Sequence, residues 1–529
     1  MKLKKLVNNH SLTYTIIFYL LASLLISCSQ ESNDYSYESI NKAVSEYQLG
    51  EIDQSSPLNY YLTRAYALLE GKESLMATIS TSKFEMDMNV PDESVSETLK
   101  SRILSEKILE VVTYKDSVAA VVTEDVDEWI LLNYTWIEDG KWVNGGQGFA
   151  ESLKEVDDQL KADLPIHYSN LPRIQAIKNV PSNAQPFVDY IRTAESPKDF
   201  MMSQLASHRL VIGGEYHRRK VSWDMYSDLI NDPHFADVCG TIFMELPSHR
   251  QSTMDEFMCS NTMNPELVLD IFRDEQIHGW WDKGEYDFIC RVWSINRNLP
   301  DEKRIKIILA DYQIPYSSIQ NTDELKSALD SEENRNTHMA DVIENYISSK
   351  DDFRHCLFLV GAAHAYKSSV PGVGEEVGTA GEQLTERLGA SDVYIVFQHV
   401  LPRDNSGRHK SQIRGGIFDR AFEINGNRPV GFSLEGSPFG EEPFDGLYEL
   451  KYKAETGLYK DNYDGYLFLH ELSSEPQNGP LMDVFNDSFI SEMKRRSRYM
   501  GWNNREDIWF GYNVDELSKD KIEQALLED

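Results

Sequence analysis

Five apolar runs, all after residue 209, constrain the fold of this chain more than any other feature. They read LVIGG, GTIFM, IKIILA, CLFLVG and VYIVF, and stretches with helical spacing separate them. Continuous apolar runs that alternate with helices are typical of a parallel sheet covered on both faces. The sequence therefore predicts an α/β domain over residues 201–475, with a mainly parallel sheet flanked by helices. A connector with one short helix, residues 166–200, and a C-terminal extension, residues 476–529, are expected on either side.

Polar residues that can carry chemistry follow four of these runs. Glu215 and His217 follow the first run, and Glu245, Asp311 and His364 follow the next three. In open parallel sheets, ligands bind beyond the carboxyl ends of the strands. We therefore expect these carboxylates and imidazoles to share one cleft at the rim of the sheet.

Each of these residues also has an ordinary structural interpretation. A single histidine after a strand is usually a hydrogen-bonded residue of the core or rim, and Asp311 could simply cap the next helix. His399, which follows the fifth run, is left out of the predicted site. The occurrence of carboxylates and imidazoles at the same end of several strands favours a functional site. The small residues Gly214 and Gly361 would let a backbone or ligand approach closely.

The motifs of several common enzyme classes are missing from the sequence. It has no GxSxG elbow, no HExxH zinc helix and no phosphate-binding P-loop. Without an activated serine or cysteine, the residues fit attack by water, with His217 or His364 as the base and a carboxylate that orients it or holds a cation. His217, Glu245 and His364 could instead bind a divalent metal that activates the water. The sequence leaves both mechanisms open.

Residues 46–165 have a different pattern, which predicts a small separate α+β domain. Helical spacing follows Pro57, and the later segments ILEVVTY, SVAAVVT, WILLNYTWI and KWVNG have the composition of strands. The pair Asp139-Gly140 predicts a tight hairpin turn between the last two. Helices followed by a curved antiparallel sheet resemble the NTF2-like cone fold.

The first residues have the pattern of a targeting segment. Three lysines precede an apolar run from Thr15 to Ile26, which is shorter than the ~20 residues of a membrane span. This pattern predicts an export signal over residues 1–27. The break LISC resembles the lipobox of bacterial lipoproteins, which implies lipidation of Cys28, a flexible tether over residues 28–45 and a bacterial outer-membrane anchor facing the periplasm or the cell surface. The alternative is an uncleaved anchor with a chance cysteine.

The chain is strongly acidic, and this limits its partners. Its formal net charge is −34, or about −37 without residues 1–27, which hold three lysines and no acidic residue. Such a surface repels phosphate backbones, so nucleic acid is not expected as a partner. The cysteines after Cys28 show neither a CxxC pair nor a Cys/His metal spacing.

The order of the strand-end motifs resembles one superfamily. A GxxH motif from Gly214 to His217, then Glu245, then a second GxxH motif from Gly361 to His364 resemble erythromycin esterases, ChaN-type haem-uptake lipoproteins and TIKI/TraB proteins. The segment VWSINRN before IKIILAD, and the helix start RNTHMA at Arg335, are similar to further motifs of these proteins. The resemblance covers residues 185–475, approximately, and implies the erythromycin esterase/ChaN-like fold.

The resemblance also implies roles for individual residues. In the esterases, the residues tied to catalysis correspond to His217 and Glu245, with Glu215 and His364 beside them. The spacing between Glu215 and His217 is one residue shorter than in the esterases and is closer to ChaN-like proteins. For Trp281, ordinary helix packing is the alternative to a contact with substrate. We expect substrate contacts from Arg335, Asp311, Tyr216 and Trp281.

Three functions follow from these observations. The leading hypothesis is an exported, membrane-anchored hydrolase of an ester, lactone or amide bond. The first alternative is a ChaN-like haem-binding uptake lipoprotein without catalysis. The second alternative is a TIKI-like peptidase that depends on a divalent metal. All three expect a small-molecule or peptide ligand, and the sequence does not decide whether haem, a metal or neither is the cofactor.

Overall fold

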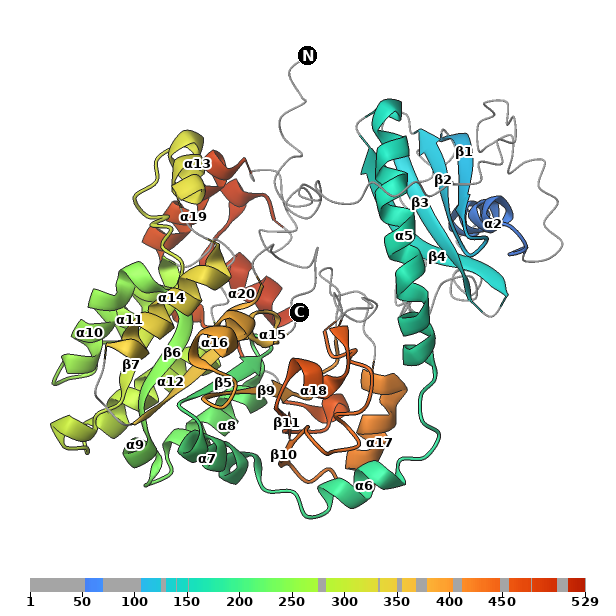
Figure 1. Cartoon of the computed structure of the whole chain (residues 1–529). Coiled ribbons are helices and arrows are strands. Elements are labelled where there is room, and N and C mark those ends of the chain that lie inside the picture. The colour runs from blue at the N-terminus through green and yellow to red at the C-terminus, as the bar shows by residue number, and fades with distance from the viewer. Residues whose placement is uncertain are drawn as a thin grey trace.

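The structure of the chain is a computed structural model, shown in Figure 1. Three predictions lie outside the residues that it describes: the export signal with its tether, the lipidation of Cys28, and the substrate contact of Trp281. Within the described residues, no helix combines the length and the apolar character needed to cross a membrane. The described ranges are 53–69, 106–124, 130–138, 140–150, 152–274, 282–331, 334–349, 354–367, 378–402, 412–447, 456–476, 478–501 and 512–528.

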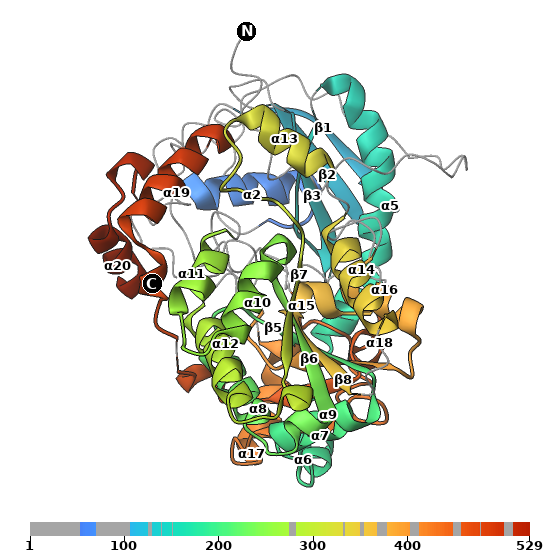
Figure 2. The same cartoon turned by 90° about the vertical axis from the view of Figure 1, so that its left-hand side faces the viewer.

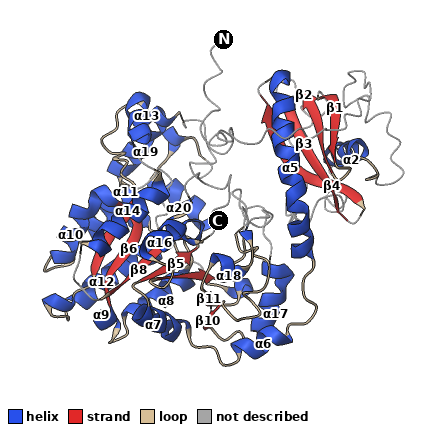
Figure 3. Ribbon diagram, viewed as in Figure 1, coloured by secondary structure: helices blue, strands red, loops and turns tan. Residues whose placement is uncertain are grey.

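A seven-stranded sheet organises the larger part of the molecule (Figure 3). Its strand order is β10-β11-β9-β5-β8-β6-β7, and all neighbours are parallel except β10 and β11. The five apolar runs supply the five strands from β5 to β9, so the predicted mainly parallel sheet is confirmed. The strands are β5 (Leu210–Glu215), β6 (Cys239–Pro247), β7 (Lys306–Asp311), β8 (His355–Gly361), β9 (Val393–Gln398), β10 (Val430–Ser433) and β11 (Gly465–Phe468).

Helices cover both faces of this sheet, because successive residues of a strand point to opposite sides. In β5, Val211 joins the core on one face, and Leu210 and Ile212 join the core on the other. The helices are α6 (Gln185–Ile191), α7 (Pro197–Ser207), α8 (Lys220–Ile230), α9 (Phe235–Val238), α10 (Gln251–Cys259), α11 (Pro265–Arg273), α12 (Lys283–Asn296), α13 (Thr322–Ser331), α14 (Arg335–Ser348), α15 (Ala362–Ala365), α16 (Ala380–Leu388), α17 (Ile417–Ile424) and α18 (Tyr459–Asn462). Helices α8, α10, α11 and α12 pack on the face of Val211, and α6, α14, α16 and α17 pack on the opposite face.

The small N-terminal domain is an antiparallel sheet between two helices. Ala120 and Val122 of β2 pack with α5, whereas Val121 packs with α2 on the other face. Glu138 pairs with Lys141, which places the predicted hairpin turn between β3 and β4. The likeness to a cone fold stays a prediction. The elements are α2 (Pro57–Leu69), β1 (Lys107–Tyr114), β2 (Val118–Glu124), β3 (Ile130–Glu138), β4 (Lys141–Ala150) and α5 (Leu153–Lys178).

Helix α5 differs from the expectation of a connector after residue 165. It continues to Lys178, although Pro165 and Pro172 lie inside it. Each proline removes a helical hydrogen bond, but Tyr168 and Leu171 continue the packing of the helix against the sheet of the small domain. Tertiary packing therefore outweighs the local signal of the prolines. The short helix expected farther along the connector is present as α6.

The C-terminal extension belongs to the core of the larger domain. It contains α19 (Asp487–Met500) and α20 (Lys519–Glu528). Phe489, Met493 and Ile522 join the apolar cluster on the α11 and α12 side of the sheet. Figure 2 shows α19 and α20 beside α11. Short 3-10 helices complete the domain at Ser248–Arg250, Asp301–Lys303, Ile413–Gly416, Leu472–Ser474, Met482–Val484 and Val514–Glu516.

Candidate active site

The carboxyl ends of four neighbouring strands bring the candidate residues to one edge of the sheet. Glu215 ends β5, Glu245 lies near the end of β6, and Asp311 ends β7. His364 lies in α15, directly after β8. The three carboxylates are 3–5% exposed. Buried charges of one sign are costly unless they are paired and hydrogen-bonded, so their partners decide what this cluster can do.

His217 and Glu215 form a hydrogen-bonded pair. The Nδ1 atom of His217 lies 2.6 Å from Oε1 of Glu215. A carboxylate only accepts hydrogen bonds, so the proton of the neutral imidazole is at Nδ1 and the lone pair is at Nε2. A Cβ atom at Gly361 would lie 3.0 Å from Nε2 of His217 and 3.2 Å from Oε2 of Glu245. Gly361 is therefore the residue that lets the imidazole and the second carboxylate approach each other.

Arg335 neutralises the other two carboxylates. Its Nε and Nη2 atoms donate to the two oxygens of Asp311 over 2.6 and 2.8 Å, and Nη2 also donates to Oε1 of Glu245 over 2.6 Å. Burial alone would raise the pKa of Glu245, but Arg335, His364 and His217 outweigh it and lower the pKa to about 2. The backbone N–H of Gly361 donates to the second oxygen of Glu245 over 2.6 Å. Glu245 is thus a fixed anion.

His364 is oriented by a residue that sequence reasoning did not single out. Its Nδ1 lies 2.7 Å from Oδ1 of Asn336, so the carboxamide oxygen accepts the ring proton and Nε2 carries the lone pair. Nε2 faces Nη1 of Arg335, a donor, at 3.4 Å. Burial lowers the pKa of His364 to about 4 against the attraction of Glu245. His364 is therefore neutral near pH 7 and accepts from Arg335.

A divalent metal fits this arrangement poorly. Arg335 already occupies Asp311 and one oxygen of Glu245, and Gly361 donates to the other oxygen. Among the residues that the structure describes, no group of three or more His, Cys, Asp or Glu side chains has metal-binding geometry. The cation that balances the carboxylates is the guanidinium of Arg335.

Two tyrosines directly follow carboxylates of the cluster in the chain. The hydroxyl of Tyr216 donates to the carbonyl oxygen of Gly446 over 3.0 Å, so this side chain is tied to the loop after β10. Its expected contact with substrate stays a prediction. The guanidinium of Arg335 lies 5.4 Å from the ring centre of Tyr312, a cation–π contact that the sequence did not indicate. Tyr312 directly follows Asp311, so its position beside the end of β7 was the available signal.

The partners of Asp311 and His399 show whether each residue has the ordinary structural role considered for it. Asp311 pairs with Arg335 instead of capping the following helix. His399 is 1% exposed, and its two ring nitrogens face the hydroxyl of Tyr466 at 2.7 Å and a carboxylate oxygen of Asp419 at 3.1 Å. It is a core residue, which agrees with its exclusion from the predicted site.

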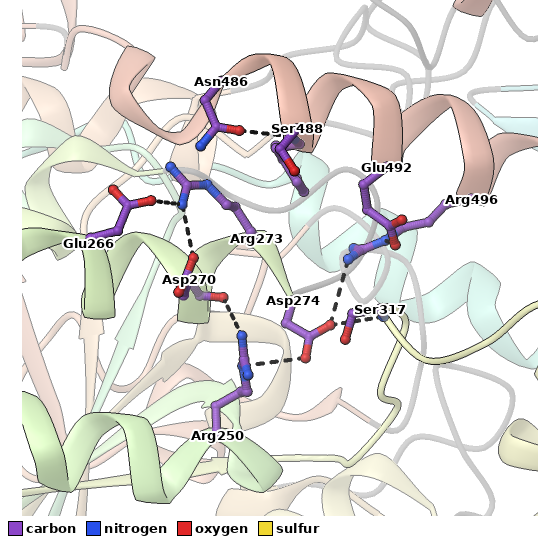
Figure 4. A pocket seen from close by; sticks show the side chains of 11 residues that line it. Arg250, Glu266, Asp270, Arg273, Asp274, Ser317, Asn486, Ser488, Glu492 and Arg496 are labelled. Atoms are coloured by element: carbon purple, nitrogen blue, oxygen red, sulfur yellow. Dashed lines mark hydrogen bonds and ion pairs between the residues drawn. The ribbon is translucent and has the colours of Figure 1, made fainter.

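A polar pocket lies between α11 and α19 (Figure 4). It has a volume of about 310 Å³. Asp274 accepts from the backbone N–H of Ser317 over 3.1 Å and pairs with Arg250 and Arg496 at 3.4 and 3.6 Å. Arg273 pairs with Asp270 at 2.9 Å. Arginine–carboxylate pairs therefore connect α19 of the C-terminal extension with α11, and we call this region the α11–α19 joint.

The fold and this cluster define an α/β protein with a histidine–carboxylate site at the carboxyl edge of a parallel sheet. No family model and no curated protein matches the chain. Similar solved structures include a mutant of the erythromycin esterase EreC in its open conformation, with 12% identity over 54% of this chain and 95% of that chain, at a TM-score of 0.38. Another is ChaN of Campylobacter jejuni, which has cofacially bound haem, with 16% identity over 40% of this chain and 89% of that chain, at a TM-score of 0.27. A Bacillus cereus protein has 10% identity over 54% of this chain and 97% of that chain, at a TM-score of 0.35.

Two of the three groups named by the sequence resemblance, the erythromycin esterases and ChaN, are thus represented among these similar solved structures. A shared fold does not by itself carry a function. The residues of the site therefore have to support any function by themselves.

Proposed function

We propose that this protein hydrolyses an ester, lactone or amide bond, with His217 as the base that activates water. The observation that carries the proposal is the pair of His217 with Glu215, whose Nδ1···Oε1 distance is 2.6 Å. It leaves the lone pair at Nε2, the nitrogen on the side of Gly361 and Glu245. A buried carboxylate behind an imidazole stabilises the imidazolium that forms after proton transfer.

The other charged residues fit the later steps of such a reaction. After Nε2 of His217 takes a proton from water, the water oxygen attacks the acyl carbon and negative charge develops on the acyl oxygen. Arg335 carries a second N–H on Nη1, besides the one that faces His364, and this donor can stabilise that charge. The imidazolium of His217 then gives its proton to the leaving oxygen or nitrogen. Glu245 and Asp311 hold the guanidinium in place.

Turnover by the protein from residue 29 onward tests this proposal. The substrates are a panel of esters, lactones and amides, and the variant is His217→Gln. General acid–base groups contribute about 10²–10⁴-fold, so kcat should fall by that factor while the fold is kept. His234→Gln is the matched control, because His234 is exposed and lies before α9 at the opposite end of the strands. Undiminished turnover in His217→Gln would exclude His217 as the base.

Haem binding is the second candidate function. With its proton at Nδ1 held by a carboxylate, His217 has the tautomer that would hold haem iron through Nε2. The His217 side chain is 26% exposed, so the ring is accessible. Haem titration should then give a saturable shift of the Soret band that His217→Gln removes. Such a shift, without hydrolysis of any member of the panel, would favour this function over the hydrolase.

A metal-dependent peptidase is the candidate with the least support. It needs carboxylates and imidazoles that converge on a cation, whereas Arg335 holds Glu245 and Asp311. We therefore expect a chelator such as EDTA to leave turnover unchanged. Inactivation by the chelator, restored by added zinc or manganese, would reverse this ranking.

We also propose that the mature protein is held at the bacterial outer membrane by a lipid on Cys28. The support is the sequence of residues 1–28, with its three lysines, apolar run and terminal cysteine. The full chain should incorporate labelled palmitate in a bacterial host and fractionate with the outer membrane. Cys28→Ser should abolish the label. A labelled Cys28→Ser variant would contradict the assignment.

A further inference from the structure

The turn that follows β5 has an unusual backbone. Arg218, the residue directly after His217, has φ of +66°. A residue with a side chain seldom adopts this left-handed conformation, and such positions persist only where the surroundings hold them. This turn sends the chain from the end of β5 toward α8, which begins at Lys220. The orientation of His217 at the site therefore depends on what holds the turn.

Asp282 is the residue that holds it. The carboxylate is 3% exposed. Its Oδ2 accepts from the backbone N–H of Arg218 over 3.0 Å and from the indole N–H of Trp223 over 2.6 Å. Its Oδ1 accepts from the backbone N–H of Gly284 over 2.7 Å and from the side-chain amide of Asn478 over 2.8 Å. One buried carboxylate thus joins the turn, α8, the start of α12 and the C-terminal extension.

The segment just before the C-terminal extension reaches the same turn through a second contact. Arg219 donates to both oxygens of Glu475, over 2.8 and 2.7 Å. This bidentate pair is largely buried, since the two side chains are 11% and 9% exposed. Such pairs fix geometry as well as charge. The two residues that follow His217 are therefore both tied to other segments, Arg218 through Asp282 and Arg219 through Glu475.

We propose that Asp282 is a positioning residue for His217: it holds the left-handed turn at Arg218 so that the imidazole stays on Glu215 with its lone pair directed into the site. Asn478 of the C-terminal extension and Glu475, just before it, complete this clamp. Asp282 lies away from the reacting atoms and acts only through the turn. The inference rests on the proposed function of His217, and the spectroscopic arm of its test does not require a substrate.

The test uses Asp282→Asn in the chain from residue 29 onward. Each carboxylate oxygen accepts from two donors, so an amide nitrogen at either position would face two N–H groups and lose both hydrogen bonds. The first readout is the NMR resonance of the His217 ring N–H, which hydrogen bonding to Glu215 shifts downfield, and which His217→Gln identifies. We expect Asp282→Asn to broaden or lose this resonance. With a hydrolysed substrate, kcat should fall by about 10², because small displacements of a catalytic group have that effect, while KM is kept.

Rescue separates positioning from a general loss of stability. Glycine adopts positive φ without strain, so Arg218→Gly should restore the resonance and most of kcat in the Asp282→Asn background. Arg218→Ala removes the same side chain but keeps the Cβ atom, and it should not rescue. Equal rescue by both variants would overturn the proposal, and so would an unchanged resonance in Asp282→Asn.

A milder variant covers the case in which Asp282→Asn does not fold. Asn478→Ala removes one of the four donors and leaves the carboxylate intact. It should weaken the His217 resonance and lower kcat by several-fold, and an unchanged resonance would overturn the proposal. If no substrate is hydrolysed but the resonance responds as expected, the clamp stands and the hydrolase proposal fails.

Discussion

The edge of the sheet and the α11–α19 joint are built from the same residue types, but they differ in what their charges are bound to. In the joint, Asp274 lies 2.9 Å from the imidazole of His249 but also pairs with Arg250 and Arg496. At the sheet edge, Arg335 neutralises only Glu245 and Asp311, and the remaining carboxylate, Glu215, binds an imidazole. The difference teaches that a buried carboxylate–imidazole pair becomes a candidate for chemistry when the arginine of its cluster is held by other carboxylates.

Removal of Arg335 should produce the largest effect on stability. Arg335→Met keeps most of the volume but leaves Glu245 and Asp311 buried without a cation. Breaking a buried ion pair on one side costs about 3–5 kcal/mol. Urea unfolding should show this loss. A change below ~1 kcal/mol would mean that the sheet edge is as solvated as the exposed Glu266–Arg273 pair of the joint.

A methyl group at Gly361 should separate the two parts of the site. In Gly361→Ala the new Cβ would lie 3.0 Å from Nε2 of His217 and 3.2 Å from Oε2 of Glu245. Overpacking of this kind costs about 1–3 kcal/mol, and turnover should fall by roughly 10² because the imidazole is displaced. Gly479→Ala is the matched control, since a Cβ there meets nothing within 4 Å. Equal activity of the two variants would contradict the proposed geometry.

Acid should weaken the fold through His364. Its pKa is lowered from 6.5 to about 4, so the unfolded chain binds a proton that the folded chain does not bind until the pH is lower. The contribution of His364 to stability is therefore complete above pH 6.5 and decreases as the pH falls toward 4, by about 3 kcal/mol. His364→Gln should flatten this part of the pH profile in urea unfolding. An unchanged profile would show that the pKa of His364 is the same in the folded and the unfolded chain.

Asn336 makes a narrower test of the same histidine. Its neutral carboxamide accepts the Nδ1 proton of His364 over 2.7 Å, whereas a carboxylate in Asn336→Asp would stabilise the imidazolium. The titration of His364, followed by NMR, should then move to higher pH, with His364→Gln to identify the signal. Titration at the same pH in both proteins would mean that the two side chains do not interact.

The smallest effect is expected at the joint. Glu266 pairs with Arg273 but is 57% exposed. Exposed pairs contribute about 0–1 kcal/mol, so Glu266→Gln should change the free energy of unfolding by less than that, and salt should reduce the difference. A larger loss would show that this exposed pair contributes as much to the free energy of unfolding as the buried pairs at the sheet edge.

The sequence predicted the part of the site that depends on strand order. Glu215, Glu245, Asp311 and His364 could be placed together because each follows an apolar run, and parallel strands end at one edge. The pairing of these residues could not be predicted. Whether Arg335 would balance a carboxylate or contact substrate depends on where α14 lies against β7, and no periodicity in the sequence encodes that position.

The remaining gaps have a similar cause. Asn336 and Asp282 are ordinary helix-start residues in the sequence, and only the tertiary structure brings them to His364 and to the turn after His217. Helix α5 was missed for the opposite reason, because its prolines give a strong local signal that packing overrides. Local patterns thus predict elements and strand ends, whereas side-chain partners across long sequence separations require the fold.

The strand order has a consequence for the synthesis of the protein. Leu210 of β5 pairs with Cys356 of β8 on one side and with Val393 of β9 on the other. Strand β5 therefore cannot pair with either neighbour until most of the chain has been made. Contacts between residues far apart in the sequence also form slowly. The clamp through Asn478 forms later still. A nascent or truncated chain thus carries His217 and Glu215 but has no assembled site, so any activity appears only when the protein is nearly complete.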